Sequence, residues 1–295
     1  KKQIVEVTNM RLLKYIWKNT VLKCLNSKMV VFVILMLVTS HSYLNPLRQF
    51  SMAVNYPVSW CVFPFAMCSF TYLIMFWFGV IYVNSDVPFM QHVNMYHAIR
   101  VGRRYWGLGQ IGGIFLRSLI MVLITIFSTI LPLLPKIEWS NGWGKLLRTA
   151  ATTNALSQYQ SNVVIYSDIF SEYTPLELMV LEILVCTLIC TFVGVLMFFL
   201  SLYMNKIIAV AVGLALAIAL FPVLNMHPLI RYKLAKFIPT VWAELARIAT
   251  VDHTYYWLPS LIYMVLFLLV GIAIMTGFIM YKIRHVEFNW DNEDM

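Results

Sequence analysis

The sequence predicts an all-α integral membrane protein with about six transmembrane helices, an N-terminal amphipathic interfacial helix and an outer helical hairpin. Hydrophobic residues make up 61% of the 295-residue chain and charged residues only 12%, against about 25% charged in an ordinary soluble domain. Mean hydropathy is +0.76. The apolar runs are too long for the alternating strands of an outer-membrane barrel, so helices are expected.

Six apolar stretches are long enough to be considered as spans, since about 17–25 helical residues cross the hydrocarbon core. They are residues 29–44, 58–83, 112–134, 176–202, 207–223 and 258–280. Only residues 203–206 separate the fourth stretch from the fifth, which predicts a hairpin-like turn there. Residues 1–295 are expected to form a single transmembrane domain.

The segment before the first span has a helical pattern of its own over residues 10–25. Its apolar positions recur at helical spacing and are Leu13, Ile16, Trp17, Val21 and Cys24. Its basic positions, on another face, are Arg11, Lys14 and Lys18. This pattern is typical of a helix lying in the plane of the inner leaflet. A solvated, charged helix is the alternative.

The two long outer connections differ in character. Residues 135–175 are polar and rich in turn residues, and the segment is long enough to fold back on the outer surface. Residues 224–257 instead hold two amphipathic segments, 229–238 and 241–248, which Pro239 separates. We expect two short helices that dip into the outer leaflet, where protein or water must cover any irregular backbone.

The distribution of Lys and Arg predicts the orientation. If both termini lie on the side of the second–third and fourth–fifth connections, that side carries thirteen basic residues and the other carries eight. Cytoplasmic loops carry the excess of basic residues, so both termini are predicted to be cytoplasmic. The formal charge of +9 is explained by this topology rather than by nucleic-acid binding, because the basic residues cluster beside apolar runs.

Two charges fall well inside predicted spans, away from the first residues, where ionisable residues are costly and are candidates for function. Arg117 lies near the cytoplasmic end of the third span and is expected to snorkel to the inner headgroups. Glu182 lies near the outer end of the fourth span, so the two should not pair. We predict that Glu182 lines a transport path; a structural hydrogen bond is the alternative.

Familiar motifs give little chemistry. Residues 107–112, GLGQIG, match a dinucleotide-binding string, but no strand precedes them and they lead into a span. Gly109 and Gly113 form a small-residue pair suited to close helix packing. Walker A, H-E-x-x-H and G-x-S-x-G sequences are absent. The five cysteines are scattered, mostly within apolar segments, and are expected to serve packing rather than a disulfide framework.

No metal site is predicted. Four residues of the 224–257 connection carry ligand-type side chains, namely His227, Glu244, Asp252 and His253, but their spacing is not diagnostic of a metal. Glu177 and Glu182 point about 140° apart on one helix, which argues against a paired acid–base site. No catalytic residue is therefore predicted.

Residues 89–106 are predicted to form a short basic helix between the second and third spans. The apolar stripe is Phe89, Val93, Tyr96 and Ile99, and the basic residues beside it are Arg100, Arg103 and Arg104. A membrane subunit needs a helix of this kind to dock a cytoplasmic protein and respond to its movement. The alternative is that the three arginines anchor the loop to anionic lipid.

The layout resembles the permease subunits of ABC transporters of the ABC-2 type. The matching elements are the entry helix at residues 10–25, six spans, the basic loop MYHAIRVGRRYWGLGQ and the outer hairpin HPLIRYKLAKFIPTVWAELARI. The resemblance covers essentially the whole chain. It implies two permease chains, identical or homologous, bound to two cytoplasmic ATPase subunits, with residues 89–106 as the coupling helix.

The resemblance also implies export of an amphiphile, such as a peptide, drug, lipid or glycan, across a bacterial plasma membrane. No cofactor is expected on this chain, because ATP and Mg²⁺ would bind the partner subunit. The chain itself is then a transport subunit and not an enzyme. The alternatives are an ATP-independent transporter or an immunity-type membrane protein, and, more remotely, an intramembrane enzyme.

Overall fold

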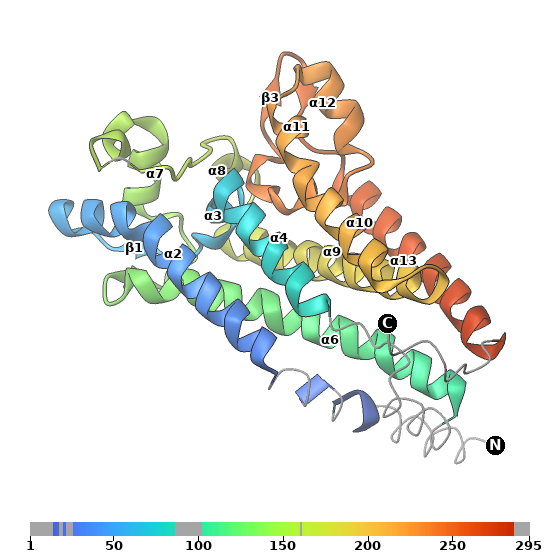
Figure 1. Ribbon diagram of the computed structural model, residues 1–295. Coiled ribbons are helices and arrows are strands. Elements are labelled where there is room, and N and C mark those ends of the chain that lie inside the picture. Colours follow the sequence, from blue (N-terminus) through green and yellow to red (C-terminus); the bar gives the residue numbers. More distant parts are fainter. Residues whose placement is uncertain (1–13, 18–19, 22–25, 86–101, 160, 286–295) are drawn as a thin grey trace, which may run out of the picture.

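The computed structural model describes residues 14–17, 20–21, 26–85, 102–159 and 161–285. Within these ranges the protein is mostly helical (Figure 1). The helices that form long apolar spans are α2 Ser27–Val54, α6 Arg103–Ile130, α9 Pro175–Tyr203, α10 Lys206–Ile218 (together with α11 Leu220–Asn225, which follows it) and α13 Leu261–His285. The shorter helices are α3 Phe63–Met67, α4 Phe70–Asn84, α7 Gly144–Thr152, α8 Ile169–Glu172, α11 Leu220–Asn225 and α12 Pro228–Ala235.

Short 3-10 helices and strands complete the connections. The 3-10 helices are η1 Leu131–Leu133, η2 Asn154–Tyr159, η3 Pro239–Ala243 and η4 Leu245–Arg247. The strands are β1 Val58–Ser59, β2 Ile137–Glu138, β3 Val251–Asp252 and β4 Tyr255–Tyr256. β1 pairs with β2 in parallel, with Val58 opposite Ile137, and β3 pairs with β4 as an antiparallel hairpin.

Five helices of the described chain are long and apolar enough to cross a membrane. They are α2, α6 continued by η1, α9, α10 continued by α11, and α13. The predicted all-α class is therefore confirmed, with several helices that could span a membrane. α9 lies at the centre, in contact with α6, α10 and α13, and 61% of its apolar window is buried, against 22% for α13. The exposed apolar face of α13 is the kind of surface that lipid covers.

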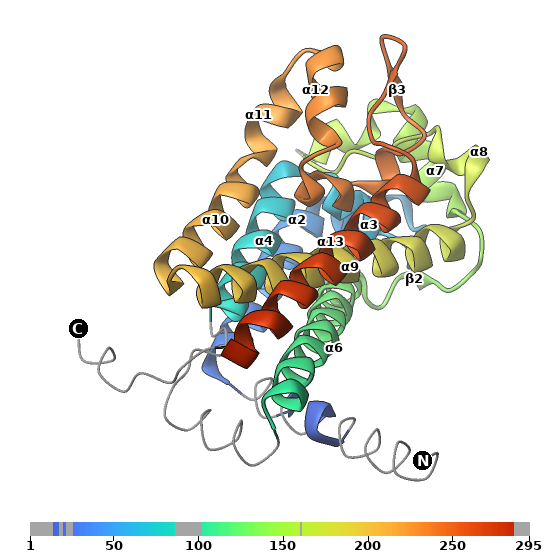
Figure 2. The same ribbon diagram turned by 90° about the vertical axis from the view of Figure 1, so that its right-hand side faces the viewer.

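The bundle has two ends of different character. α2, α6 and α10 begin, and α4, α9 and α13 finish, at one end, which we call the basic end (Figures 1 and 2). The charged residues described at this end are basic and include Lys14, Lys28, Arg103, Arg104, Lys206, Lys282 and Arg284. The opposite end carries α7, α8, α12 and the β3–β4 hairpin (Figure 2), and we call it the loop end.

Hydrogen bonds between helix ends hold the basic end together. The Lys28 ammonium donates to Ser85 Oγ at 2.7 Å, which joins the start of α2 to the residue after α4. Arg103 donates to the backbone carbonyl of Arg284 at 3.2 Å, joining α6 to α13. The turn between α9 and α10 is as short as the sequence predicts, with Asn205 capping α10 by accepting from the backbone N–H of Ile208.

The predicted second span, residues 58–83, is wrong as a single helix. Its first part forms β1 and α3, and α4 begins only at Phe70. Pro64 stands in the first turn of α3, where its missing N–H is harmless, and Ser69 has an extended backbone that separates α3 from α4. α4 has 15 residues and is shorter than a typical span.

Other boundaries also shift. α2 continues past residue 44, through Pro46, and ends at Val54, followed by its C-cap Asn55 in the left-handed region. The third span begins at Arg103 rather than residue 112, and Gly102, at φ 91°, separates it from the preceding residues. The predicted helix over 89–106 therefore cannot be continuous to its end. The fifth span covers Lys206–Asn225, close to the predicted residues 207–223, with a turn at Ala219 between α10 and α11.

Arg117 does not snorkel to headgroups. Its side chain is buried, and its guanidinium donates to Asn84 Oδ1 on α4 at 2.6 Å. A guanidinium with a neighbouring acceptor inside the bundle has no need to reach the interface, so the prediction from depth alone is wrong. The contact fixes α6 against the end of α4.

Glycines allow close packing at several points of the bundle. A Cβ on Gly194 of α9 would lie 2.6 Å from Ile114 of α6, and a Cβ on Gly107 would lie 2.9 Å from Ile283 of α13. A Cβ on Gly109 would collide with the ring of Tyr15. Gly109 thus faces the described part of the N-terminal helix, and Gly113 is buried in α6.

Candidate functional site

The 226–260 segment at the loop end folds down onto the bundle and brings buried charges with it. Residues 239–246 are all buried, and η3 and η4 contact α9. Thr240 Oγ1 donates to the Leu216 carbonyl at 2.9 Å, and Trp77 Nε1 donates to the Thr240 carbonyl at 3.2 Å. These bonds tie η3 to α10 and α4. α12 matches the first predicted amphipathic segment, whereas η3 and η4 replace the second predicted helix.

Glu244 turns inward between η3 and η4 and is fully buried. Its Oε2 accepts from Arg247 at 2.9 Å and from the indole N–H of Trp257 at 3.1 Å. Its Oε1 has no hydrogen-bond partner among the described residues. The non-helical backbone of Glu244, φ −98° and ψ 46°, aims the side chain at these donors and interrupts the helix that the sequence pattern predicts.

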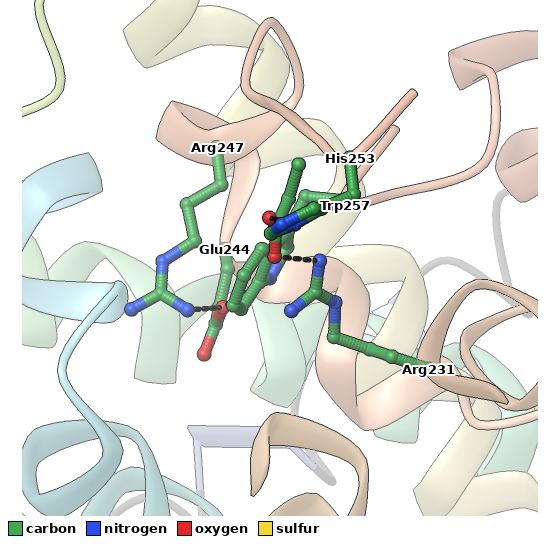
Figure 3. Close-up of polar contacts among 6 residues, drawn as sticks. Arg231, Glu244, Arg247, His253 and Trp257 are labelled. Atoms are coloured by element: carbon green, nitrogen blue, oxygen red, sulfur yellow. Dashed lines mark hydrogen bonds and ion pairs between the residues drawn. The ribbon is translucent and has the colours of Figure 1, made fainter. Parts of the chain in front are cut away.

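Two arginines lie against the indole of Trp257. The guanidinium carbon of Arg231 lies 3.6 Å from the ring centroid and that of Arg247 lies 4.4 Å from it. In Figure 3 the indole lies between the two guanidinium groups. Arg231 also pairs with Asp252 at 2.9 Å. We call Arg231, Glu244, Arg247, Asp252 and Trp257 the loop-end cluster.

Arg247 connects the loop-end cluster to two other parts of the chain. It donates to the Cys68 carbonyl, between α3 and α4, at 2.7 Å. Its guanidinium also lies 5.1 Å from the ring centroid of Tyr166, in the 135–175 connection. One side chain therefore joins three segments that are far apart in the sequence.

Burial and pairing act in opposite directions on the carboxylates of the loop-end cluster. Burial raises the pKa of Glu244 from 4.5 to about 7, although Arg247, Trp257 and Arg231 act to lower it. The hydrogen bond from Arg231, followed by that from His253, lowers the pKa of Asp252. Asp252 thus stays ionised near neutral pH, whereas the Glu244 carboxyl is close to half ionised there.

Glu182 lies beneath this cluster on α9. It is fully buried, its Oε1 accepts from Cys186 Sγ at 3.3 Å, and its Oε2 has no hydrogen-bond partner among the described residues. Glu244 lies near it, because η3 and η4, which flank Glu244, contact α9. Glu177 is engaged separately, in the capping box of α9 with Thr174.

The other predicted site residues are distributed as follows. Phe89, Val93, Tyr96, Ile99 and Arg100 lie outside the described residues. Arg103 and Arg104 are exposed in the first turn of α6. In the described part of the chain, no group of three or more His, Cys, Asp or Glu residues is placed to hold a metal ion. Glu182 is fully buried in α9, and its place on a transport path stays a prediction.

Sequence reasoning did not identify Arg231, Arg247 and Trp257 as site residues. A signal was present, because these residues lie in the same connection as Glu244 and Asp252, within segments apolar enough to be buried. Buried charges are paired, so the presence of both acidic and basic residues in this connection predicts ion pairs rather than a metal site.

The arrangement provides a buried carboxylate that can take up a proton near neutral pH, and a cross-link between loops. No family model, curated protein or solved structure matches the chain.

Proposed function

We propose that the chain is the membrane-spanning permease subunit of an ATP-driven exporter of the ABC-2 type, with an amphiphilic substrate. Six crossings are part of this proposal, with α3 and α4 together forming the second. Support comes from the two ends of that segment. β1 pairs with β2 at the loop end, and Ser85, just after α4, bonds to Lys28 at the basic end.

The observation that carries the proposal is the position of the connection between α4 and α6. Its two described ends, Ser85 and Arg103, both lie at the basic end. Each of these residues is bonded to another helix end, Ser85 to Lys28 of α2 and Arg103 to Arg284 of α13. A partner that moves this connection would therefore act on α2, α6 and α13 at once, which is the requirement for a coupling segment.

The proposed mechanism is alternating access driven from outside the chain. Cytoplasmic ATPase subunits bind ATP and Mg²⁺, close on each other and displace residues 89–106. The helices then rearrange against a second permease copy or homologue around the amphiphile. The basic end faces the cytoplasm of a bacterial cell, with both termini on that side.

The coupling assignment is tested with two variants of this connection. Tyr96→Ala removes an aromatic anchor, which is the type of residue that dominates docking energy, and should reduce co-purification of the ATPase. Arg104→Ala is the matched control, because Arg104 is exposed at the start of α6, whereas Arg103 also supports α13. If Tyr96→Ala leaves complex yield and substrate-stimulated ATP hydrolysis intact while Arg104→Ala disrupts them, the segment is a lipid anchor instead.

The orientation has its own test. A cysteine replacing Asn292 should be labelled by an impermeant thiol reagent only after the cells are permeabilised. Labelling in intact cells would place the C-terminus outside and invert the proposed topology.

An ATP-independent transporter is the second candidate, and the two interacting carboxylates favour it. Glu182 and Glu244 each have an oxygen without a described partner, and buried carboxylates in a membrane protein are typical of proton relays. Glu182→Gln should abolish transport in either case, with Glu177→Gln as the control. Transport that needs a proton gradient and persists without any ATPase would decide for the second candidate.

A further inference from the structure

A cleft of about 640 Å³ opens at the loop end, between α12, the β3–β4 hairpin and the start of α13. Its apolar lining includes Ile248, Leu258, Leu261 and Ile262. Four tyrosines also line it, namely Tyr173, Tyr232, Tyr256 and Tyr263. The loop-end cluster does not line this cleft. A cavity with an apolar interior and a few phenolic groups is suited to a ligand with both an apolar and a polar part.

One charged side chain, Lys236, lines the cleft. Its ammonium lies 4.3 Å from the ring centroid of Tyr232, and its backbone carbonyl accepts from the hydroxyl of Tyr263 at 3.1 Å. The lysine is half-buried, and no acidic side chain in the described part of the chain forms an ion pair with it. A partly desolvated cation without a carboxylate partner attracts an anionic ligand group.

The cleft continues onto the lipid-facing side of α13. Ile262 lines the cleft and is 74% exposed. Exposed apolar residues follow it at helical spacing along the same helix, namely Leu266, Leu269, Val270, Ile274 and Phe278. A ligand whose polar group lies in the cleft therefore has an apolar surface beside it, running toward the basic end.

We propose that this cleft binds an anionic amphiphile, with its phosphate or carboxylate at Lys236 and its hydrocarbon chain passing Ile262 along α13. The headgroup belongs at Lys236 rather than at Tyr173, because Glu172 and Glu177 act on that tyrosine and would repel an anion there. A small hydrated anion is a poor occupant, since the apolar walls would strip its water without replacing those hydrogen bonds. The assignment does not depend on the transport mechanism, because a resident lipid and a transported one present the same chemistry.

The test is equilibrium binding of fluorescent phosphatidylglycerol and phosphatidylcholine with identical acyl chains, to the full chain in neutral detergent. Lys236→Gln should weaken phosphatidylglycerol binding about fivefold, which corresponds to the roughly 1 kcal/mol that one lysine contributes to attraction of an anionic lipid. Phosphatidylcholine binding should change little. Lys236→Arg should retain the preference for the anionic lipid, and Lys233→Gln is the control, since Lys233 is exposed on α12 and does not line the cleft.

Three results would overturn the assignment. Equal binding of the two lipids by the unmodified protein excludes charge recognition. An equal loss in Lys233→Gln shows a general surface effect. Displacement of the lipid by glycerol 3-phosphate at comparable concentration shows that the site binds the headgroup alone. A monodisperse profile in size-exclusion chromatography and an unchanged Tm for each variant establish that any loss of binding arises in the cleft.

Discussion

Arg247→Met is the most informative perturbation of the loop-end cluster, because it leaves Glu244 buried with only the indole N–H of Trp257 as a donor. Removing one partner of a buried ion pair costs about 3–5 kcal/mol. That loss applies where Glu244 is ionised. Below its pKa of about 7 the Glu244 carboxyl takes up a proton and no longer needs a cationic partner. The stability lost in the variant is then only that of the hydrogen bond from Arg247 to the Cys68 carbonyl, roughly 1.5–3 kcal/mol for a charged donor.

The sign of the pH dependence follows from the two pKa values. The Glu244 carboxyl has a pKa near 4.5 in the unfolded chain and near 7 in the folded protein. Its contribution to the free energy of unfolding is therefore fully present below pH 4.5 and is lost as pH rises through 7. Arg247→Met removes a group that lowers this pKa, so the variant should lose more stability than the wild type as pH rises. We expect a deficit in Tm of roughly 5 °C at pH 5.5 and about 10 °C at pH 8.5.

Thermal unfolding in mild detergent, followed with a thiol-reactive fluorogenic dye, measures this deficit. Cys61, Cys68, Cys186 and Cys190 are free and buried, so they become reactive on unfolding. Arg148→Met is the matched control, because Arg148 is exposed at the same end of the bundle and should change Tm little. A deficit equal to that of the control, or one that does not grow between pH 5.5 and 8.5, would refute the role given to the Glu244–Arg247 pair.

Two further predictions concern packing of the bundle. Gly194→Ala should destabilise the protein by about 1–3 kcal/mol in the same unfolding assay, because its Cβ would lie 2.6 Å from Ile114 Cγ2. Gly277 has open space around it, so Gly277→Ala is the control and should be neutral or slightly stabilising. Trp77→Phe should lower the free energy of unfolding by about 1–3 kcal/mol, because it leaves the buried Thr240 carbonyl without its indole donor. Equal Tm values for this variant and the wild type would show that α4 does not hold η3 in place.

The membrane class and most of the spans could be predicted because apolar length is a local property. α9 differs from the predicted fourth span only at its ends. The second span was mispredicted because hydropathy does not register the extended backbone at Ser69 or the proline that starts α3. Pro46 does not mark the end of α2, because the helix continues through it and buries Leu47 and Phe50.

The candidate site was predictable only in part, because it depends on contacts between distant segments. Glu182 could be singled out from one buried charge in an apolar helix. Its neighbour Glu244 comes from another segment, and the placement of Arg247 against Cys68 joins residues 179 apart in sequence. Periodicity contains no information on such a pairing. The positions of Arg231 and Arg247 against Trp257 follow from the fold of the loop, not from residue spacing.

The bond between Arg247 and the Cys68 carbonyl also has a consequence for synthesis of the protein. At about 5–20 residues per second, the ribosome adds the 179 residues that separate the two partners in roughly 10–40 seconds. During that interval α3 and α4 are already made, while the arginine that satisfies the break between them is not. The contact that bridges α3 and α4 is therefore completed by the last third of the chain, and a nascent polypeptide arrested before residue 247 lacks the donor that satisfies the Cys68 carbonyl.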